Sequence, residues 1–177
     1  ASNDNDLITA TNFLANGRLV AFPTETVYGL GADATNNVAV AHVFAAKGRP
    51  NFNPLIVHVT DLNAAKKIAV FNQAELQLAK AFWPGPLTLV LPLRSGHNIA
   101  PLVSAGLNSV ALRVPAHPVA RDLLRKYGGP IAAPSANISG QISPTTAAHV
   151  IGSLSGKVTA IIDGGPCEVG LESTIIG

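Results

Sequence analysis

Charged side chains are scarce in this sequence. The 177 residues include 12 Lys and Arg and 10 Asp and Glu, so charged residues make up 12% and the net charge is +2. An average soluble domain has about 25% charged residues. Hydrophobic residues make up 47% of the chain, which excludes an intrinsically disordered protein. The few cations also disfavour a non-specific nucleic-acid binder, because neutralising many phosphates takes many Lys and Arg.

Cysteine, aromatic residues and long apolar runs are few or absent. The single cysteine, Cys167, excludes a disulfide framework and a cysteine-rich zinc site, and it indicates a reducing compartment. Aromatic residues make up 5%, fewer than a single-strand binder built on base stacking needs. No apolar run reaches the ~18 residues of a membrane span. The polar start Ala1–Asp6 does not resemble a signal peptide, so we expect a cytoplasmic protein.

Apolar strand-like segments alternate with helix-like segments along the whole chain, without a linker or a repeat. Periodicity and capping residues predict helices from Asp6 to Gly17, Asn37 to Gly48, Asn72 to Phe82, Pro118 to Gly128, and one opened by Ser143-Pro144. Strands are predicted over 19–22, 55–59, 87–91, 109–114, 130–133 and 158–162. This alternation predicts one three-layer α/β domain over residues 1–177, with helices on both faces of a twisted, mixed or mostly parallel sheet. Residues 173–177 read as a strand cut in mid-run, so we expect the natural chain to continue.

Familiar catalytic motifs such as the P-loop or the nucleophile elbow are missing, and three polar loops stand out instead. Each follows a predicted strand or precedes a helix, which is where ligands bind in open α/β sheets. The first loop, Pro23–Gly31, offers the hydroxyls of Thr24 and Thr26 and glycines that allow close backbone approach. An ordinary turn in which threonine caps its own backbone explains this loop equally well.

The second loop begins with two cations, Lys47 and Arg49, separated by one glycine. A lysine point charge beside a planar arginine fork suits a phosphate or a carboxylate. The alternative is a cationic helix end that interacts with the helix dipole, worth about 0.3–1 kcal/mol. That alternative accounts for Lys47 but not for Asn53 or for the following strand that carries His58. We therefore favour an anion site.

The third loop, Ser135–Gly140, is built from small side chains and precedes the helix expected at Ser143. Exposed backbone N–H groups and a helix N-terminus together make an anion site. For Ser143 alone, an ordinary N-cap is the better interpretation.

Arg113 lies in a predicted strand among apolar neighbours. Such an arginine is usually paired or functional, because burying a lone charge is costly. His117 stands at a helix start, where capping is its expected role. Cys167 has no base beside it in the sequence, and we interpret it as non-catalytic.

Five blocks, in order, resemble the YrdC family of threonylcarbamoyl-AMP synthases: Pro23–Gly31, Lys47–Pro50, Asn53–Leu55, Ser135–Gly140 and Glu172–Ile175. The similarity runs over essentially the whole chain. The resemblance implies a three-layer α/β fold with a twisted mixed sheet and a concave, positively charged central cleft. It also implies the first step of threonylcarbamoyladenosine synthesis beside the tRNA anticodon. In that step L-threonine, bicarbonate and ATP give threonylcarbamoyl-AMP and pyrophosphate.

Matching positions imply the roles of individual residues. Threonine would be held by Thr26, His58, Arg113 and Ser173. Lys47 and Arg49 would be catalytic, with Lys47 near the junction of the two substrates. ATP would be held by Arg49, Asn53, Ser109, Ser135, Asn137 and Ser143. We assign no residue to a metal, because no carboxylate cluster is visible, and expect Mg²⁺ to arrive with ATP.

The resemblance also implies partners and a difference from the family. Proteins that transfer the threonylcarbamoyl group to tRNA would act downstream, weak tRNA binding is expected, and no membrane is involved. Relatives continue beyond Gly177 into a further strand and an arginine-containing loop that contacts ATP, so we expect the C-terminus to be truncated. Two alternatives stay open: a non-catalytic module for double-stranded RNA, tRNA or ribosome assembly, and a carbamoyl-transfer domain of a larger enzyme. Shape recognition of RNA needs few aromatic residues.

Overall fold

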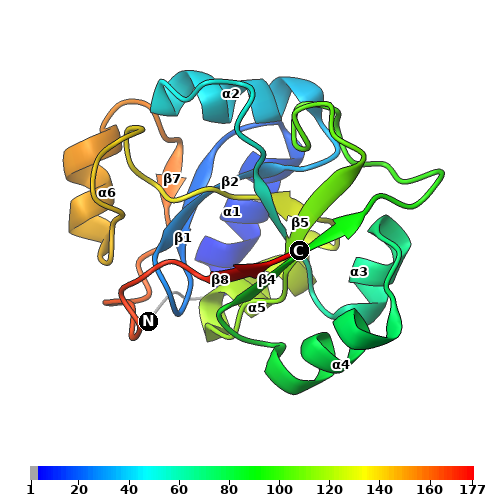
Figure 1. Ribbon diagram of the computed structural model, residues 1–177. Coiled ribbons are helices and arrows are strands. Elements are labelled where there is room, and N and C mark those ends of the chain that lie inside the picture. The colour runs from blue at the N-terminus through cyan, green and yellow to red at the C-terminus, as the bar shows by residue number, and fades with distance from the viewer. Residues whose placement is uncertain (1–3) are drawn as a thin grey trace.

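A mixed eight-stranded sheet forms the centre of the computed structural model, which describes residues 4–177 (Figure 1). The strand order is β7-β1-β2-β6-β3-β5-β4-β8. The strands are β1 (Val20–Pro23), β2 (Tyr28–Asp33), β3 (Ile56–His58), β4 (Leu87–Pro92), β5 (Ser109–Arg113), β6 (Ile131–Ala132), β7 (Ala160–Ile161) and β8 (Thr174–Ile176). Antiparallel pairs such as β1–β2 and parallel pairs such as β3–β5 both occur, which confirms the predicted mixed sheet.

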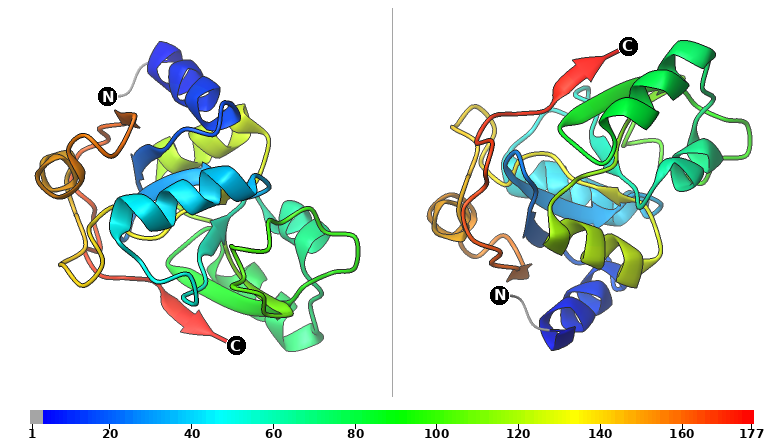
Figure 2. Two further views of the ribbon diagram at one scale, coloured as in Figure 1. Left: turned by 90° about the horizontal axis from the view of Figure 1, so that it is seen from above. Right: turned by 90° about the horizontal axis from the view of Figure 1, so that it is seen from below.

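Helices cover both faces of the sheet, as predicted. In β1, Val20 and Phe22 belong to one cluster of buried side chains, whereas Ala21 and the preceding Leu19 belong to another. Successive side chains of a strand point to opposite faces, so the two clusters lie on opposite sides of the sheet. Figure 2 shows the helices around the sheet from above and from below. The first cluster includes residues of α1 (Asp4–Ala15) and α5 (Pro118–Tyr127), and the second those of α2 (Asn37–Lys47), α3 (Leu62–Ile68), α4 (Gln73–Phe82) and α6 (Ala147–Leu154).

Local capping signals in the sequence predicted several helix ends correctly. Asn72 and Glu75 form the expected capping box at the start of α4, with N–H to oxygen distances of 2.9 and 2.6 Å. Nδ1 of His117 accepts the N–H of Val119 and so caps α5. Gly48 ends α2 in the left-handed conformation, with φ of 59°, which glycine adopts without steric cost.

Two predicted helix starts are wrong. Asp6 is not an N-cap, because α1 already begins at Asp4; residues 1–3 of the polar start lie outside the described residues. The helix expected at Ser143-Pro144 begins only at Ala147 and is capped by Thr146, whose hydroxyl accepts the N–H of His149. The carbonyl of Pro144 instead accepts the N–H of Tyr28, which holds this segment against β2.

The first polar loop is shorter than predicted, and one helix was not predicted. Only Thr24–Val27 is a turn, since Tyr28 already opens β2. A side chain at Gly31 would place its Cβ 2.8 Å from the Phe22 ring, so glycine here makes room for the core rather than for a ligand. The helix α3, capped by Asp61, was not predicted. None of the helices in the described range is long and apolar enough to cross a bilayer.

Candidate active site

A cavity of about 230 Å³ opens where the parallel strands β3 and β5 end. His58 and Arg113 are paired in register at the carboxyl ends of these strands, so both reach the same edge of the sheet. The side chains of Ile56 and His58 share one face of β3, and both line the cavity. The other lining residues are Thr24, Thr26, Val27, Gly29, Arg49, Pro54, Arg113, Ala133, Pro134, Ser135, Glu172, Ser173 and Ile175. The wider concave cleft stays a prediction.

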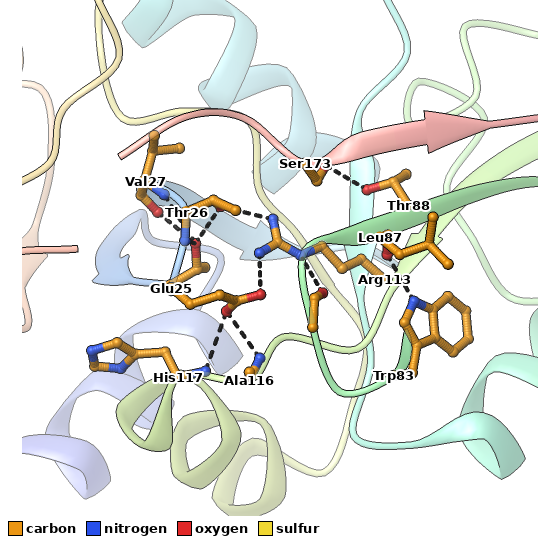
Figure 3. A network of polar contacts seen from close by, with 12 residues as sticks. Glu25, Thr26, Val27, Trp83, Leu87, Thr88, Arg113, Ala116, His117 and Ser173 are labelled. Carbon is orange, nitrogen blue, oxygen red and sulfur yellow. Dashed lines mark hydrogen bonds and ion pairs between the residues drawn. The ribbon is translucent and has the colours of Figure 1, made fainter. Parts of the chain in front are cut away.

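Arg113 is held on three sides at one end of the cavity (Figure 3). Its Nε donates to the carbonyl of Gly85 at 3.2 Å, and its Nη1 donates to the hydroxyl of Thr26 at 2.9 Å. Its Nη2 forms a 2.5 Å ion pair with Glu25. The side chains of Arg113 and Glu25 are only 4% and 8% exposed, which confirms the sequence-based expectation of a paired arginine. Burial raises the pKa of Glu25, but the charge and hydrogen bond of Arg113 outweigh it and lower that pKa overall.

His58 lies beside Arg113 and is buried. Burial and then the charge of Arg113 lower its pKa to about 3, so the imidazole is uncharged near neutral pH. Its Nδ1 is one of two buried side-chain nitrogen or oxygen atoms in residues 4–177 without a hydrogen-bond partner. An unpaired buried nitrogen is costly, so this atom is available for a polar ligand in the cavity.

Ser173 reaches the same cavity from the C-terminal segment. Its hydroxyl lies 2.7 Å from that of Thr88, a fully buried residue of β4 (Figure 3). The neighbouring strand β8 pairs with β4 in parallel, and the N–H of Gly170 donates to the carbonyl of Thr26. These contacts fix Ser173 near Thr26 and Arg113.

Lys47 supports the third polar loop from below and does not line the cavity. Its Nζ donates to the carbonyls of Ser135 and Asn137, both at 2.6 Å, and its own carbonyl accepts the N–H of Ser139. Only 1% of Lys47 is exposed. Burial and then the charge of Arg49 lower its pKa to about 8. Lys47 thereby brings a positive charge under the loop that carries Ser135 into the cavity.

Arg49 lies at the other end of the cavity and is half-buried. Its Nη2 donates to the carbonyl of Pro54 at 3.2 Å, and its Nε to that of Asn53 at 3.4 Å. Pro54, the partner of Arg49, and His58, which is in register with Arg113, are four residues apart, which is about 13 Å of extended chain. Burial lowers the pKa of Arg49, which stays charged at neutral pH.

The cavity lining includes six of the site residues predicted from the sequence: Thr26, Arg49, His58, Arg113, Ser135 and Ser173. Asn137 is buried and stabilises the third loop by donating to the carbonyls of Ile138 and Gln141. Asn53 offers its backbone carbonyl to Arg49, and Ser143 donates to Glu172 at 2.5 Å. Ser109 opens β5 at the end opposite to Arg113, about 13 Å away along the strand. The structure does not bring Ser109 to the cavity.

Two residues at the site were given no role from the sequence, Glu25 and Thr88, and a third, Glu172, was assigned no specific role. Glu25 stands between two threonines of the first loop. Its partner Arg113 is 88 positions away in the sequence, so no local pattern indicates the pair. Thr88 lies in an apolar strand and is indistinguishable from a core threonine. Glu172 belongs to the last block that matches the family. Its pKa is lowered, chiefly because the carboxylate accepts a hydrogen bond from the hydroxyl of Ser143.

Residues 4–177 contain no group of three or more His, Cys, Asp or Glu side chains that would hold a metal ion. Glu172 is the acidic residue in the cavity lining. Cys167 lies outside that lining, and burial raises its pKa to about 11. A nucleophilic thiolate is therefore disfavoured.

Fold and site together define an α/β domain with a cavity that is lined by two arginines. Residues 12–177 match the model of the Sua5/YciO/YrdC family, described as "Telomere recombination". The chain belongs to this family. It is 49% identical over 177 residues to threonylcarbamoyl-AMP synthase of Bacillus subtilis strain 168, covering 99% of this chain and 51% of the relative. It is 52% identical over 169 residues to the enzyme of the same name from Pyrococcus abyssi, covering 94% and 49%.

A solved structure shares the fold. The crystal structure of P. abyssi Sua5 complexed with L-threonine matches with a TM-score of 0.94 and 49% identity, covering 98% of this chain and 51% of that one. The chain thus spans about half the length of these relatives.

Proposed function

We propose that this chain is the catalytic domain of a threonylcarbamoyl-AMP synthase, a nucleotidyltransferase that forms threonylcarbamoyl-AMP and pyrophosphate from L-threonine, bicarbonate and ATP. The observation that carries the proposal is one cavity with a different arginine at each end, Arg113 paired with a carboxylate and Arg49 without one among the described residues. Support comes from relatives of that name at about 50% identity and from the threonine complex of P. abyssi Sua5.

The amino acid would bind at the Arg113 end. Three of the five N–H groups of Arg113 have partners, which leaves two for the carboxylate of threonine. The unpaired Nδ1 of neutral His58 and the hydroxyls of Thr26 and Ser173 would meet the hydroxyl and the nitrogen of the substrate. An uncharged imidazole suits this place, because it leaves the amine free to react.

The nucleotide would bind at the Arg49 end. Arg49 would face the phosphates, and Ser135 would present its loop to them, with the charge of Lys47 beneath. We infer supporting roles for three further residues. Asn53 holds Arg49 in place, Asn137 stabilises the third polar loop, and Ser143 holds Glu172. Ser109 does not line the cavity, and its contact with ATP stays a prediction.

The reaction needs positioning and charge neutralisation rather than a protein nucleophile. The threonine amine and bicarbonate give a carbamate and water. A carbamate oxygen then attacks the α-phosphorus of ATP. The bond between the α-phosphorus and the oxygen that bridges the α- and β-phosphates breaks, so that pyrophosphate leaves with its electron pair. Arg49 and Lys47 stabilise the charge that develops on the phosphates. Mg²⁺ bound to ATP would neutralise further phosphate charge. Glu172 is the carboxylate in the cavity lining that would lie near this ion.

Further parts of the proposal concern the cellular setting. The product would pass to proteins that transfer the threonylcarbamoyl group to the adenosine beside the tRNA anticodon, and this would take place in the cytoplasm. Weak tRNA binding is part of the same proposal. The alternative of a non-catalytic RNA-binding module is not favoured, since the matched relatives are named as enzymes.

The test is formation of threonylcarbamoyl-AMP, followed by mass spectrometry together with pyrophosphate release. The chain is incubated with ATP, with and without L-threonine and with and without bicarbonate. We expect release that depends on both threonine and bicarbonate. Threonine-independent release, or no release at all, would reject the proposal.

A further inference from the structure

Glu25 is the buried carboxylate of residues 4–177, and it lies behind Arg113 as seen from the cavity. Its Oε1 accepts from Arg113, while its Oε2 accepts the N–H groups of Ala116 and His117 at 2.9 and 3.2 Å. Glu25 does not line the candidate cavity but lines a separate hollow with Ala116 and His117. It therefore acts on a ligand of the cavity through Arg113.

The balance of charge differs between the two ends of the cavity. The ion pairs within residues 4–177 are Arg113–Glu25, Arg125–Asp122 and Lys126–Asp4, so Lys47 and Arg49 have no carboxylate within 4 Å. The other groups that face Arg113 carry no charge: the Thr26 hydroxyl, the Gly85 carbonyl and neutral His58. The Arg113 end is thus close to neutral, whereas the Arg49 end keeps its positive charge.

A neutral end and a positive end attract different ligands. A lone buried guanidinium strongly attracts any phosphate, because charges interact strongly where water is excluded. A guanidinium that is already paired gains little from a multiply charged anion, since Glu25 repels it. A zwitterionic amino acid has no net charge, so it avoids this repulsion while its carboxylate still reaches the two free N–H groups of Arg113.

We propose that Glu25 determines the specificity of this end of the cavity: by balancing Arg113, it admits a zwitterionic amino acid and excludes phosphate. The triphosphate of the nucleotide is thereby directed to Arg49 and Lys47. This inference rests on the proposed function, because it places threonine beside Arg113.

The substitution Glu25→Gln tests the inference, because it keeps the size of the side chain and removes its charge. The rate of threonylcarbamoyl-AMP formation is measured against threonine concentration at several concentrations of inorganic phosphate. In Glu25→Gln we expect phosphate to compete with threonine, with an inhibition constant about tenfold lower than in the wild type. The KM for ATP at saturating threonine should change less than about threefold. A purely structural role would not create a phosphate site.

Two further variants sharpen the experiment. Glu168→Gln is the matched control: Glu168 is exposed and lines the same hollow as Glu25, but it forms no ion pair. Phosphate should inhibit this variant no more strongly than it inhibits the wild type. Glu25→Asp keeps the charge but moves it away from Arg113, so competition by phosphate should rise about threefold. This variant decides the question if circular dichroism shows that Glu25→Gln does not fold.

Each result has a defined meaning. If phosphate inhibits the Glu25 variants no more than the wild type, or if Glu168→Gln behaves like Glu25→Gln, the inference is overturned and the proposed function stands. If the wild-type enzyme neither binds threonine in calorimetry nor uses it, the proposed function and this inference both fall.

Discussion

The two ends of the cavity hold their cations in opposite ways. Arg113 is buried and paired with Glu25 at 2.5 Å, and its other bonds go to Thr26 and Gly85. Arg49 is half-buried and bonds only to the carbonyls of Asn53 and Pro54. The first arginine is part of the core, since its loss leaves a buried charge. The second has no carboxylate partner within residues 4–177 and lines the cavity. The predictions below test this difference.

The largest effect is expected from Arg113→Met. This variant leaves Glu25 buried without its partner, and removing one member of a buried pair typically costs about 3–5 kcal/mol. Urea unfolding should show this loss in the free energy of unfolding. The double variant Glu25→Leu/Arg113→Met should recover much of it, because no buried charge is left. Equal stability of the single variant and the wild type would contradict the core role of the pair.

Arg49→Ala should leave the fold intact and damage catalysis. We expect kcat/KM for ATP to fall about 100-fold, because the phosphates lose a charge-assisted contact. The midpoint of thermal unfolding should shift by less than about 3 °C, as is usual for surface substitutions. Arg94→Ala, which removes an exposed arginine outside the cavity, serves as the control. Normal turnover in Arg49→Ala would show that the nucleotide binds elsewhere.

The lowered pKa of Lys47 predicts a pH dependence confined to the nucleotide end. As pH rises through about 8, Lys47 loses its proton and the KM for ATP should increase several-fold. In Lys47→Met the KM should be high and independent of pH from 7 to 9. Stability should move the other way: between about pH 8 and the ordinary lysine pKa near 10.4, the unfolded chain binds more protons, so the free energy of unfolding rises with pH. A flat KM in the wild type would contradict this role.

The smallest effects separate two serines predicted to bind ATP. Ser135→Ala should raise the KM for ATP about fivefold, which corresponds to one lost hydrogen bond. Ser109→Ala should change it by less than about 1.5-fold, because Ser109 does not line the cavity and its loss removes no hydrogen bond there. Steady-state kinetics with both variants will show whether the cavity, rather than the sequence match alone, identifies the ATP contacts.

Local sequence patterns were reliable where the physics is local. The capping box of Asn72 and Glu75 and the left-handed Gly48 depend on residues within one turn, and both were predicted. The helix start at Ser143 was wrong because a tertiary bond from Tyr28 to the carbonyl of Pro144 holds that segment out of the helix. A residue's neighbours in the sequence do not reveal such a bond.

The candidate site shows the same limit. The sequence placed Lys47 and Arg49 together as a clamp, but folding gives them different tasks. Lys47 turns inward to the carbonyls of Ser135 and Asn137, and Arg49 lines the cavity. The side chains of Lys47 and Arg49 point to different partners because α2 ends between these residues, at Gly48.

The sequence alone determined the alternation of strands and helices, the scarcity of charge and the five blocks that match the family. It also indicated that Arg113, set among apolar residues, has a partner or a function. Only the tertiary structure decided that the partner is Glu25, and that Arg113 is balanced by a carboxylate whereas Lys47 and Arg49, in the part of the chain that the structure describes, are not. The physical reason is that ion pairing depends on distances of a few ångströms. The register of β3 and β5 and the turn after β1 set those distances between residues 88 positions apart.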